Sequence, residues 1–263
     1  MSLSYFFSDD LHVYANVGEG RVAPVIDVEG QGGAENPFAI VSILPAEEIW
    51  NYEIGVKSQW LDKRIGFDLS YFYQEYENFQ TSIIDAASGV ATPVNAGSAT
   101  NSGVELALNA SLSEQFTLYG TLGFIDATFD DTDSDGNPQI FGGNRFRLQP
   151  ETTASLALVH EVGLSDGASL QSMISWTYRS EVFFENANTP IAGQDIAEDA
   201  ISLVGVNIGY TTAGGDWRVS AYADNLLDKE YIIDAGNTGG AFGTPTFIAA
   251  PPRFYGVEAT YKF

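Results

Sequence analysis

Apolar and polar residues alternate with a period of two along several segments of the chain. In one such segment the apolar face carries Ile65, Phe67, Leu69, Tyr71 and Tyr73, and the other face carries Gly66, Asp68, Ser70 and Gln74. The same alternation recurs within 104–112, 153–158, 204–210 and 255–263. A helix would distribute these apolar residues around its axis, so the period indicates β-strands. The pattern predicts an all-β protein whose strands are apolar on one face only.

Short and long connections alternate between these segments. Short turns are predicted at 8–10, 61–64, 113–115, 165–167 and 213–216, and long polar stretches without regular structure at about 25–48, 86–99, 130–148, 183–199 and 231–251. Long irregular loops are unusual in compact soluble domains. Short periplasmic turns and long external loops are typical of outer-membrane barrels, whose strands span roughly ten residues. The chain holds about eleven such strands, which predicts an antiparallel up-and-down transmembrane β-barrel.

Composition narrows the classes of protein that remain. Among 263 residues, 35 are acidic and only 11 are Lys or Arg, and the net charge of −24 argues against nucleic acid as a partner. Cysteine is absent, which excludes disulfides and thiolate metal sites. The first ten residues lack the basic and apolar regions of a secretory signal. An exported protein needs such a signal, so we expect the chain to be incomplete at its N-terminus.

Three stretches carry a resemblance to a known family. They are Asn51–Lys57 followed by Phe67–Tyr73, then Asn95–Glu105, and finally Asp224–Tyr231 followed by Pro252–Phe263. Taken in this order, from about Leu11 to the terminal Phe263, they resemble the C-terminal half of the TonB-dependent outer-membrane receptors. The end of the chain also resembles the signal that the barrel-assembly machinery reads.

The resemblance implies a 22-stranded barrel with an N-terminal plug domain inside it, in the outer membrane of a Gram-negative bacterium. Such receptors take up scarce nutrients such as ferric siderophores, with energy that TonB delivers through the plug. About 11 of the 22 strands fit here, so we expect residues 1–263 to be the C-terminal part of the barrel, with plug and signal peptide absent. The implied partners are outer-membrane lipid, the barrel-assembly machinery, a small ligand such as an iron chelate, and TonB through the missing plug only.

One local pattern suggests a metal ion. Asp131, Asp133 and Asp135 alternate before Gly136, which resembles the start of an EF-hand-type calcium loop within residues 131–137. The pattern departs from that loop at its twelfth position, where Gly142 stands in place of a bidentate Glu. The alternative interpretation is an acidic loop tip, because Asp, Asn and Gly also form ordinary turns. The sequence predicts no other cofactor.

Aromatic and basic residues suggest where a ligand would make contact. Tyr76 and Phe79, with Tyr71, Phe72 and Tyr73, form either a ligand platform near the external mouth or a girdle of interfacial rings. Arg145 and Arg147 flank Phe146, and they either attract an anionic ferric chelate or pair with carboxylates in the lumen.

The sequence gives no case for an enzyme. His12 and His160 are far apart, each within a predicted strand, and no Gly-x-Ser-x-Gly motif is present. Two alternatives to the receptor remain at this point: a small passive outer-membrane pore, and a secreted β-sandwich or adhesin that binds calcium or sugar. The sandwich requires the apolar face, including Leu106, Leu108, Val257 and Tyr261, to be buried between two sheets.

Overall fold

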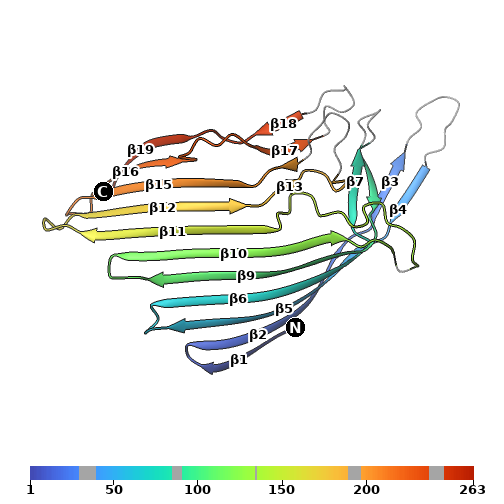
Figure 1. The fold of residues 1–263 in the computed structure, drawn as a ribbon, viewed down its shortest axis with the longest axis horizontal. Coiled ribbons are helices and arrows are strands. Elements are labelled where there is room, and N and C mark those ends of the chain that lie inside the picture. Colours follow the sequence, from blue (N-terminus) through green and yellow to red (C-terminus); the bar gives the residue numbers. More distant parts are fainter. Residues whose placement is uncertain (30–39, 85–90, 134, 189–196, 237–245) are drawn as a thin grey trace.

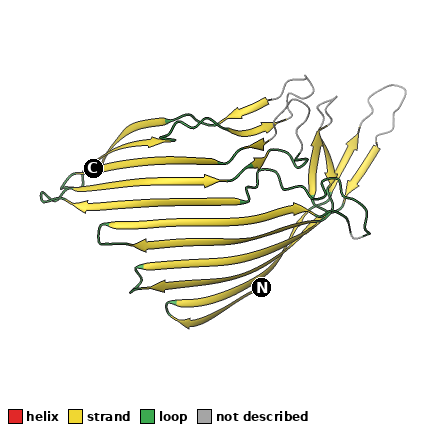
Figure 2. Ribbon diagram, viewed as in Figure 1, coloured by secondary structure: helices red, strands yellow, loops and turns green. Residues whose placement is uncertain are grey.

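The structure, a computed structural model, describes residues 1–29, 40–84, 91–133, 135–188, 197–236 and 246–263. Every regular element in these residues is a β-strand (Figure 2), as the period-two pattern predicts. Within the same residues, no helix has the length and apolarity needed to cross a membrane.

In the described residues the main element of the fold is one antiparallel sheet of eleven strands (Figure 1). Each strand pairs with its neighbour in the order β1-β2-β5-β6-β9-β10-β11-β12-β15-β16-β19. This confirms the predicted number of strands. The strands are β1 (Ser2–Ser8), β2 (Leu11–Val22), β5 (Glu47–Trp60), β6 (Ile65–Glu77), β9 (Ala99–Ser111), β10 (Phe116–Phe129), β11 (Thr152–Gly163), β12 (Ser169–Arg179), β15 (Ile201–Thr211), β16 (Trp217–Asp224) and β19 (Phe254–Tyr261).

The two ends of the sheet differ. The five predicted short turns lie at one end, together with the C-terminus, and the long connections lie at the other (Figure 1). These connections are not free of regular structure, in contrast to the expectation. They contain short antiparallel pairs: β3 (Val25–Glu29) with β4 (Ile40–Leu44), β7 (Gln80–Ile84) with β8 (Ala91–Asn95), β13 (Val182–Phe183) with β14 (Ala197–Glu198), and β17 (Ile232–Gly236) with β18 (Thr246–Ala249).

One face of the sheet is an apolar surface, and no second layer formed by the described residues covers it. Cross-strand pairing places Ile54, Tyr71, Val104 and Phe124 in one row, and all four side chains are exposed. On the last strand Val257 is 74% exposed. A sandwich would bury this face, so the sandwich interpretation is wrong. Exposed apolar rows of this kind suit the lipid-facing side of a barrel.

The opposite face is polar and lines grooves on the concave side of the sheet. Lys57 pairs with Asp68, and Tyr14 donates a 2.6 Å hydrogen bond to Glu53. Small residues lie between the larger ones on this inner wall. The ring of Tyr14 covers Gly55 so closely that a Cβ at Gly55 would lie 2.5 Å from it. The glycine therefore lets the ring lie flat along the wall.

Few side chains are fully buried, because a one-layer sheet has no interior. The buried apolar side chains gather mainly at the end with the long connections. One cluster contains Ala96, Ala99, Phe129 and Phe141, and a second contains Val182, Phe184 and Ala235. This end therefore has a packed core of its own, formed by the described parts of the connections.

Candidate functional site

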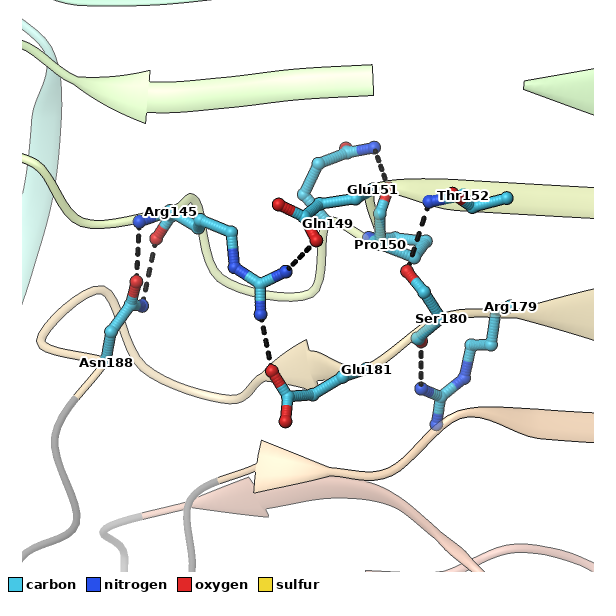
Figure 3. Close-up of polar contacts among 9 residues, drawn as sticks. All are labelled: Arg145, Gln149, Pro150, Glu151, Thr152, Arg179, Ser180, Glu181 and Asn188. Atoms are coloured by element: carbon cyan, nitrogen blue, oxygen red, sulfur yellow. Dashed lines mark hydrogen bonds and ion pairs between the residues drawn. The ribbon is translucent and has the colours of Figure 1, made fainter. Parts of the chain in front are cut away.

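The long connections meet in a network of polar contacts that we call the external hub. It joins the β10–β11 connection to the segment after β12 (Figure 3). The hub consists of Asn144, Arg145, Arg147, Glu151, Glu181, Asn186 and Asn188.

Arg145 is the centre of the hub. Its guanidinium binds Glu181 at 2.7 Å and Glu151 at 2.8 Å, and it lies 4.6 Å from the ring centre of Phe183 (Figure 3 shows the two carboxylates). Its side chain is only 18% exposed. Planar guanidinium groups suit this combination of ion pairing and stacking. Of the two alternatives for Arg145, carboxylate pairing is the one that the structure shows.

Three asparagines connect the two segments through backbone groups. Asn188 accepts a hydrogen bond from the Arg145 N–H and donates one to the Arg145 carbonyl at 3.0 Å. Asn144 donates to the carbonyls of Asn186 and Ala187, both at 2.9 Å. Asn186, which is 6% exposed, accepts from the Arg147 N–H. Because backbone and side chain both take part, the two segments form one ordered unit.

Two contacts extend from the hub to neighbouring hairpins. Asn186 donates to the hydroxyl of Thr81 on β7 at 3.0 Å, and Arg147 lies 3.7 Å from a carboxylate oxygen of Asp234 on β17. Arg147 also donates through Nε to the carbonyl of Phe184. Burial raises the pKa of Glu185 above its usual value. The charge of Arg147 opposes this shift, and the carboxylate of Asp234 adds to it.

The aromatic residues split into two groups. Tyr71 and Tyr73 lie on the outward face, with Tyr71 48% exposed. Tyr76 and Phe79 instead pack with Phe146, at ring separations of 5.7 and 5.0 Å. Phe79 also contacts the buried Phe129. These inner rings cover one another, so the structure shows them as a packed cluster beside the hub, and their contact with a ligand stays a prediction.

The acidic loop forms a tight turn around Asp133. Its carboxylate accepts hydrogen bonds from the backbone N–H groups of Asn137 and Asp135, at 2.8 and 2.9 Å. The Asn137 N–H lowers the pKa of Asp133 most, and the side chain of Asn137 adds to it. Across the described residues, no three His, Cys, Asp or Glu side chains come together as metal ligands do. Calcium bound by Asp131, Asp133 and Asp135 stays a prediction.

The two histidines contact aromatic rings. His12 stacks on Phe6 with ring centres 4.8 Å apart, and His160 stacks on Phe116 at 4.5 Å. Both pairs lie near the end of the sheet with the short turns. These contacts give each histidine a packing role.

A family model described as the β-barrel of TonB-dependent receptor-like proteins matches residues 1–226. The chain belongs to the TonB-dependent receptor family. The family comprises transport receptors rather than enzymes, and its barrels lie in the outer membrane of Gram-negative bacteria. In barrels of this class the long connections lie at the external end and the apolar face suits contact with lipid.

Solved receptors share the fold. The ferric yersiniabactin uptake receptor FyuA of Yersinia pestis matches with a TM-score of 0.80 at 19% identity, over 100% of this chain and 36% of the receptor. BauA, the ferric preacinetobactin receptor of Acinetobacter baumannii, matches with a TM-score of 0.69 at 21% identity, over 100% of this chain and 36% of that one.

Curated relatives match over shorter regions. The metal-pseudopaline receptor CntO of Pseudomonas aeruginosa is 34% identical over 115 residues, which are 44% of this chain and 15% of CntO. The probable TonB-dependent siderophore receptor PiuA of Acinetobacter baumannii is 23% identical over 201 residues, or 73% of this chain and 25% of PiuA. The chain spans about a third of the length of the solved receptors that it matches.

The sequence pattern singled out only part of the hub. The sequence indicates Arg145 and Arg147, the two cations beside Phe146, but it does not indicate Glu151, Glu181 or the three asparagines. The sequence signal for the asparagine contacts is that Asn186 and Asn188 stand two residues apart in the long connection after β12. Asparagine is common in turns, so this spacing did not identify a contact 43 residues away.

Proposed function

We propose that this chain forms the C-terminal half of the barrel wall, and part of the external mouth, of a receptor that takes up a scarce nutrient such as a ferric siderophore. The observation that carries the proposal is the one-layer sheet with an apolar outer face and a polar inner face, in a chain of this receptor family. The chain would provide the wall and the external hub, and a plug domain of the complete receptor would gate the passage.

The direction of the strands supports a barrel that needs further strands. The sheet has eleven strands, so β1 and β19 at its two edges run in the same direction. Closing the sheet on itself would place them in parallel. Bacterial single-chain barrels have an even number of antiparallel strands, and open edges are not tolerated in lipid. The strands that pair with both edges would therefore form a sheet with an odd number of strands. This disfavours the small passive pore, because that alternative requires the eleven strands to close on themselves.

The inner wall supports a protein partner inside the barrel. Tyr14, Glu53, Lys57, Asp68 and Glu105 line a groove of about 420 Å³ on this wall. Such polar and charged groups suit contact with the surface of a plug domain, and TonB would act through that plug. The barrel-assembly machinery would bind β19 and the terminal Phe263, where alternation and the final aromatic residue resemble its signal.

The test is uptake by the complete receptor that contains this chain, expressed in a bacterium without its own iron receptors. The probes are ⁵⁵Fe-yersiniabactin and ⁵⁵Fe-preacinetobactin, the chelates in the names of the two solved relatives. We expect accumulation of one of them that a protonophore abolishes. Accumulation that the protonophore leaves unchanged would support a passive pore, and failure to accumulate either chelate would contradict the ferric-chelate proposal.

A further inference from the structure

The external hub contacts two hairpins of the receptor mouth in addition to joining its own two segments. Its ion pairs and asparagine contacts hold the β10–β11 connection against residues 181–188. From this unit Asn186 reaches the β7–β8 hairpin, and Arg147 reaches the β17–β18 hairpin. These hairpins belong to strands far apart in the sheet order. The hub is thus a junction between separate parts of the external end.

The contacts inside the hub are stronger than the contacts that leave it. The side chain of Arg145 is 18% exposed and binds the half-exposed carboxylates of Glu151 and Glu181 within 2.8 Å. The Arg147–Asp234 pair is longer, at 3.7 Å, and Arg147 is 46% exposed. Short charge-assisted hydrogen bonds to a largely buried guanidinium are worth more than a longer pair of an exposed one. Loss of Arg145 would also leave the facing carboxylates of Glu151 and Glu181 without their cation. The order of the whole junction therefore depends mainly on Arg145.

We infer that Arg145 is a positioning residue of the external mouth. Through the hub it fixes Asn186 and Arg147, and these two hold the β7–β8 and β17–β18 hairpins at a set separation. Arg145 itself is paired with Glu151 and Glu181, so in this role it acts through the hub and not by contact with the nutrient. The consequence for uptake rests on the proposed function, but the positioning role does not.

The test measures the separation of the two hairpins in the complete receptor, in outer-membrane vesicles. Ser82→Cys on β7 and Ile233→Cys on β17 supply spin labels at exposed positions, and pulsed electron resonance gives the distance distribution. Arg21→Ala is the matched control, because it removes an external arginine that is paired with Glu48 and lies outside the hub. Glu151→Gln with Glu181→Gln removes both ion pairs and keeps Arg145, in case Arg145→Ala assembles poorly.

We expect a narrow distribution in the parent receptor and in Arg21→Ala, and a broad one in Arg145→Ala and in the double Gln variant. Arg145→Lys should also broaden it, because an ammonium cannot engage both carboxylates in the same planar geometry. An unchanged distribution in both hub variants overturns the inference, and so does equal broadening in Arg21→Ala.

Uptake provides a second readout that a general loss of folding would not reproduce. The probe is the ⁵⁵Fe chelate that the parent receptor takes up. In Arg145→Ala, the half-saturating concentration of this chelate should rise by up to about tenfold. The maximal rate of uptake per assembled receptor should be retained. A loss of maximal rate at unchanged half-saturation overturns the positioning role. If the parent receptor takes up neither chelate, the proposed function fails, and the distance measurement still decides the role of Arg145.

Discussion

The ring of Tyr14 on β2 lies directly over Gly55 on β5, on the inner wall of the sheet. A Cβ at Gly55 would meet the ring at 2.5 Å, so only glycine leaves space for it. The hydroxyl of Tyr14 then reaches Glu53 two residues along β5. The pair shows how this wall holds a large ring without projecting it into the lumen.

Replacing Gly55 with valine should push the Tyr14 ring off the wall. We expect a loss of about 1–3 kcal/mol in the free energy of unfolding, as is usual for overpacking. The measurement is the temperature at which the folded receptor loses its heat-modifiable mobility on gels. Gly18→Val is the control, since a Cβ there has nothing within 4 Å. Equal losses in the two variants would contradict the close packing at Gly55.

An arginine introduced at one of two neighbouring residues of β9 should be costly at the first position and tolerated at the second. Leu106 lies on the lipid-facing side and Ala107 on the lumenal side. Leu106→Arg should therefore cost about 2–4 kcal/mol near the membrane midplane, while Ala107→Arg, facing Asp68 and Thr121, should cost little. The fraction of receptor that assembles in the outer membrane reports the difference. Similar assembly of both variants would show that the two faces are assigned wrongly.

Acidity should strengthen the hub through Glu185. Burial raises its pKa, so the folded hub binds this proton more tightly than the unfolded chain does. Stability should then fall as the pH rises from the usual glutamate value through the raised pKa. Hydrogen exchange of residues 181–188, corrected for the intrinsic rate, measures this. Glu185→Gln should remove the dependence, and a dependence that persists in that variant must come from another group.

The turn around Asp133 should show the opposite dependence on pH. Hydrogen bonds from Asn137 lower the pKa of Asp133. Their contribution to the stability of the turn is therefore present above the usual pKa of aspartate, and it is lost as the pH falls through the lowered pKa. Exchange of the Asn137 amide should rise in Asp133→Asn. Asp135→Asn removes the same charge two residues away, and an equal rise there would point to net charge rather than to the turn.

The strands and their faces could be predicted because each depends on local sequence. Alternation over about ten residues fixes which side chains share a face, and Leu106 and Val257 lie on the face that their period predicts. The short turns were predictable for the same reason, since Ser, Asp and Gly within a few residues favour them. This local information was enough for the architecture, and the three stretches in their order carried the resemblance to the family.

The external hub could not be predicted in the same way. Its partners come from different connections: Arg145 and Glu181 are separated by 36 residues, and no periodicity relates them. The pairing of Arg145 follows from how β11 and β12 bring the two connections together, which only the folded sheet specifies. The hairpins in the long connections were missed because strands of about five residues give too little alternation to detect.

The central claim, that this sheet is a membrane barrel wall with lipid on one side and water on the other, is tested most directly along β9. The chain has no cysteine of its own, so spin labels can be placed one at a time from Val104 to Asn109 in the complete receptor in lipid vesicles. The account predicts that labels at even positions collide mainly with oxygen dissolved in lipid, and labels at odd positions mainly with a water-soluble nickel chelate. Accessibility without this alternation, or with its phase reversed, would contradict the account.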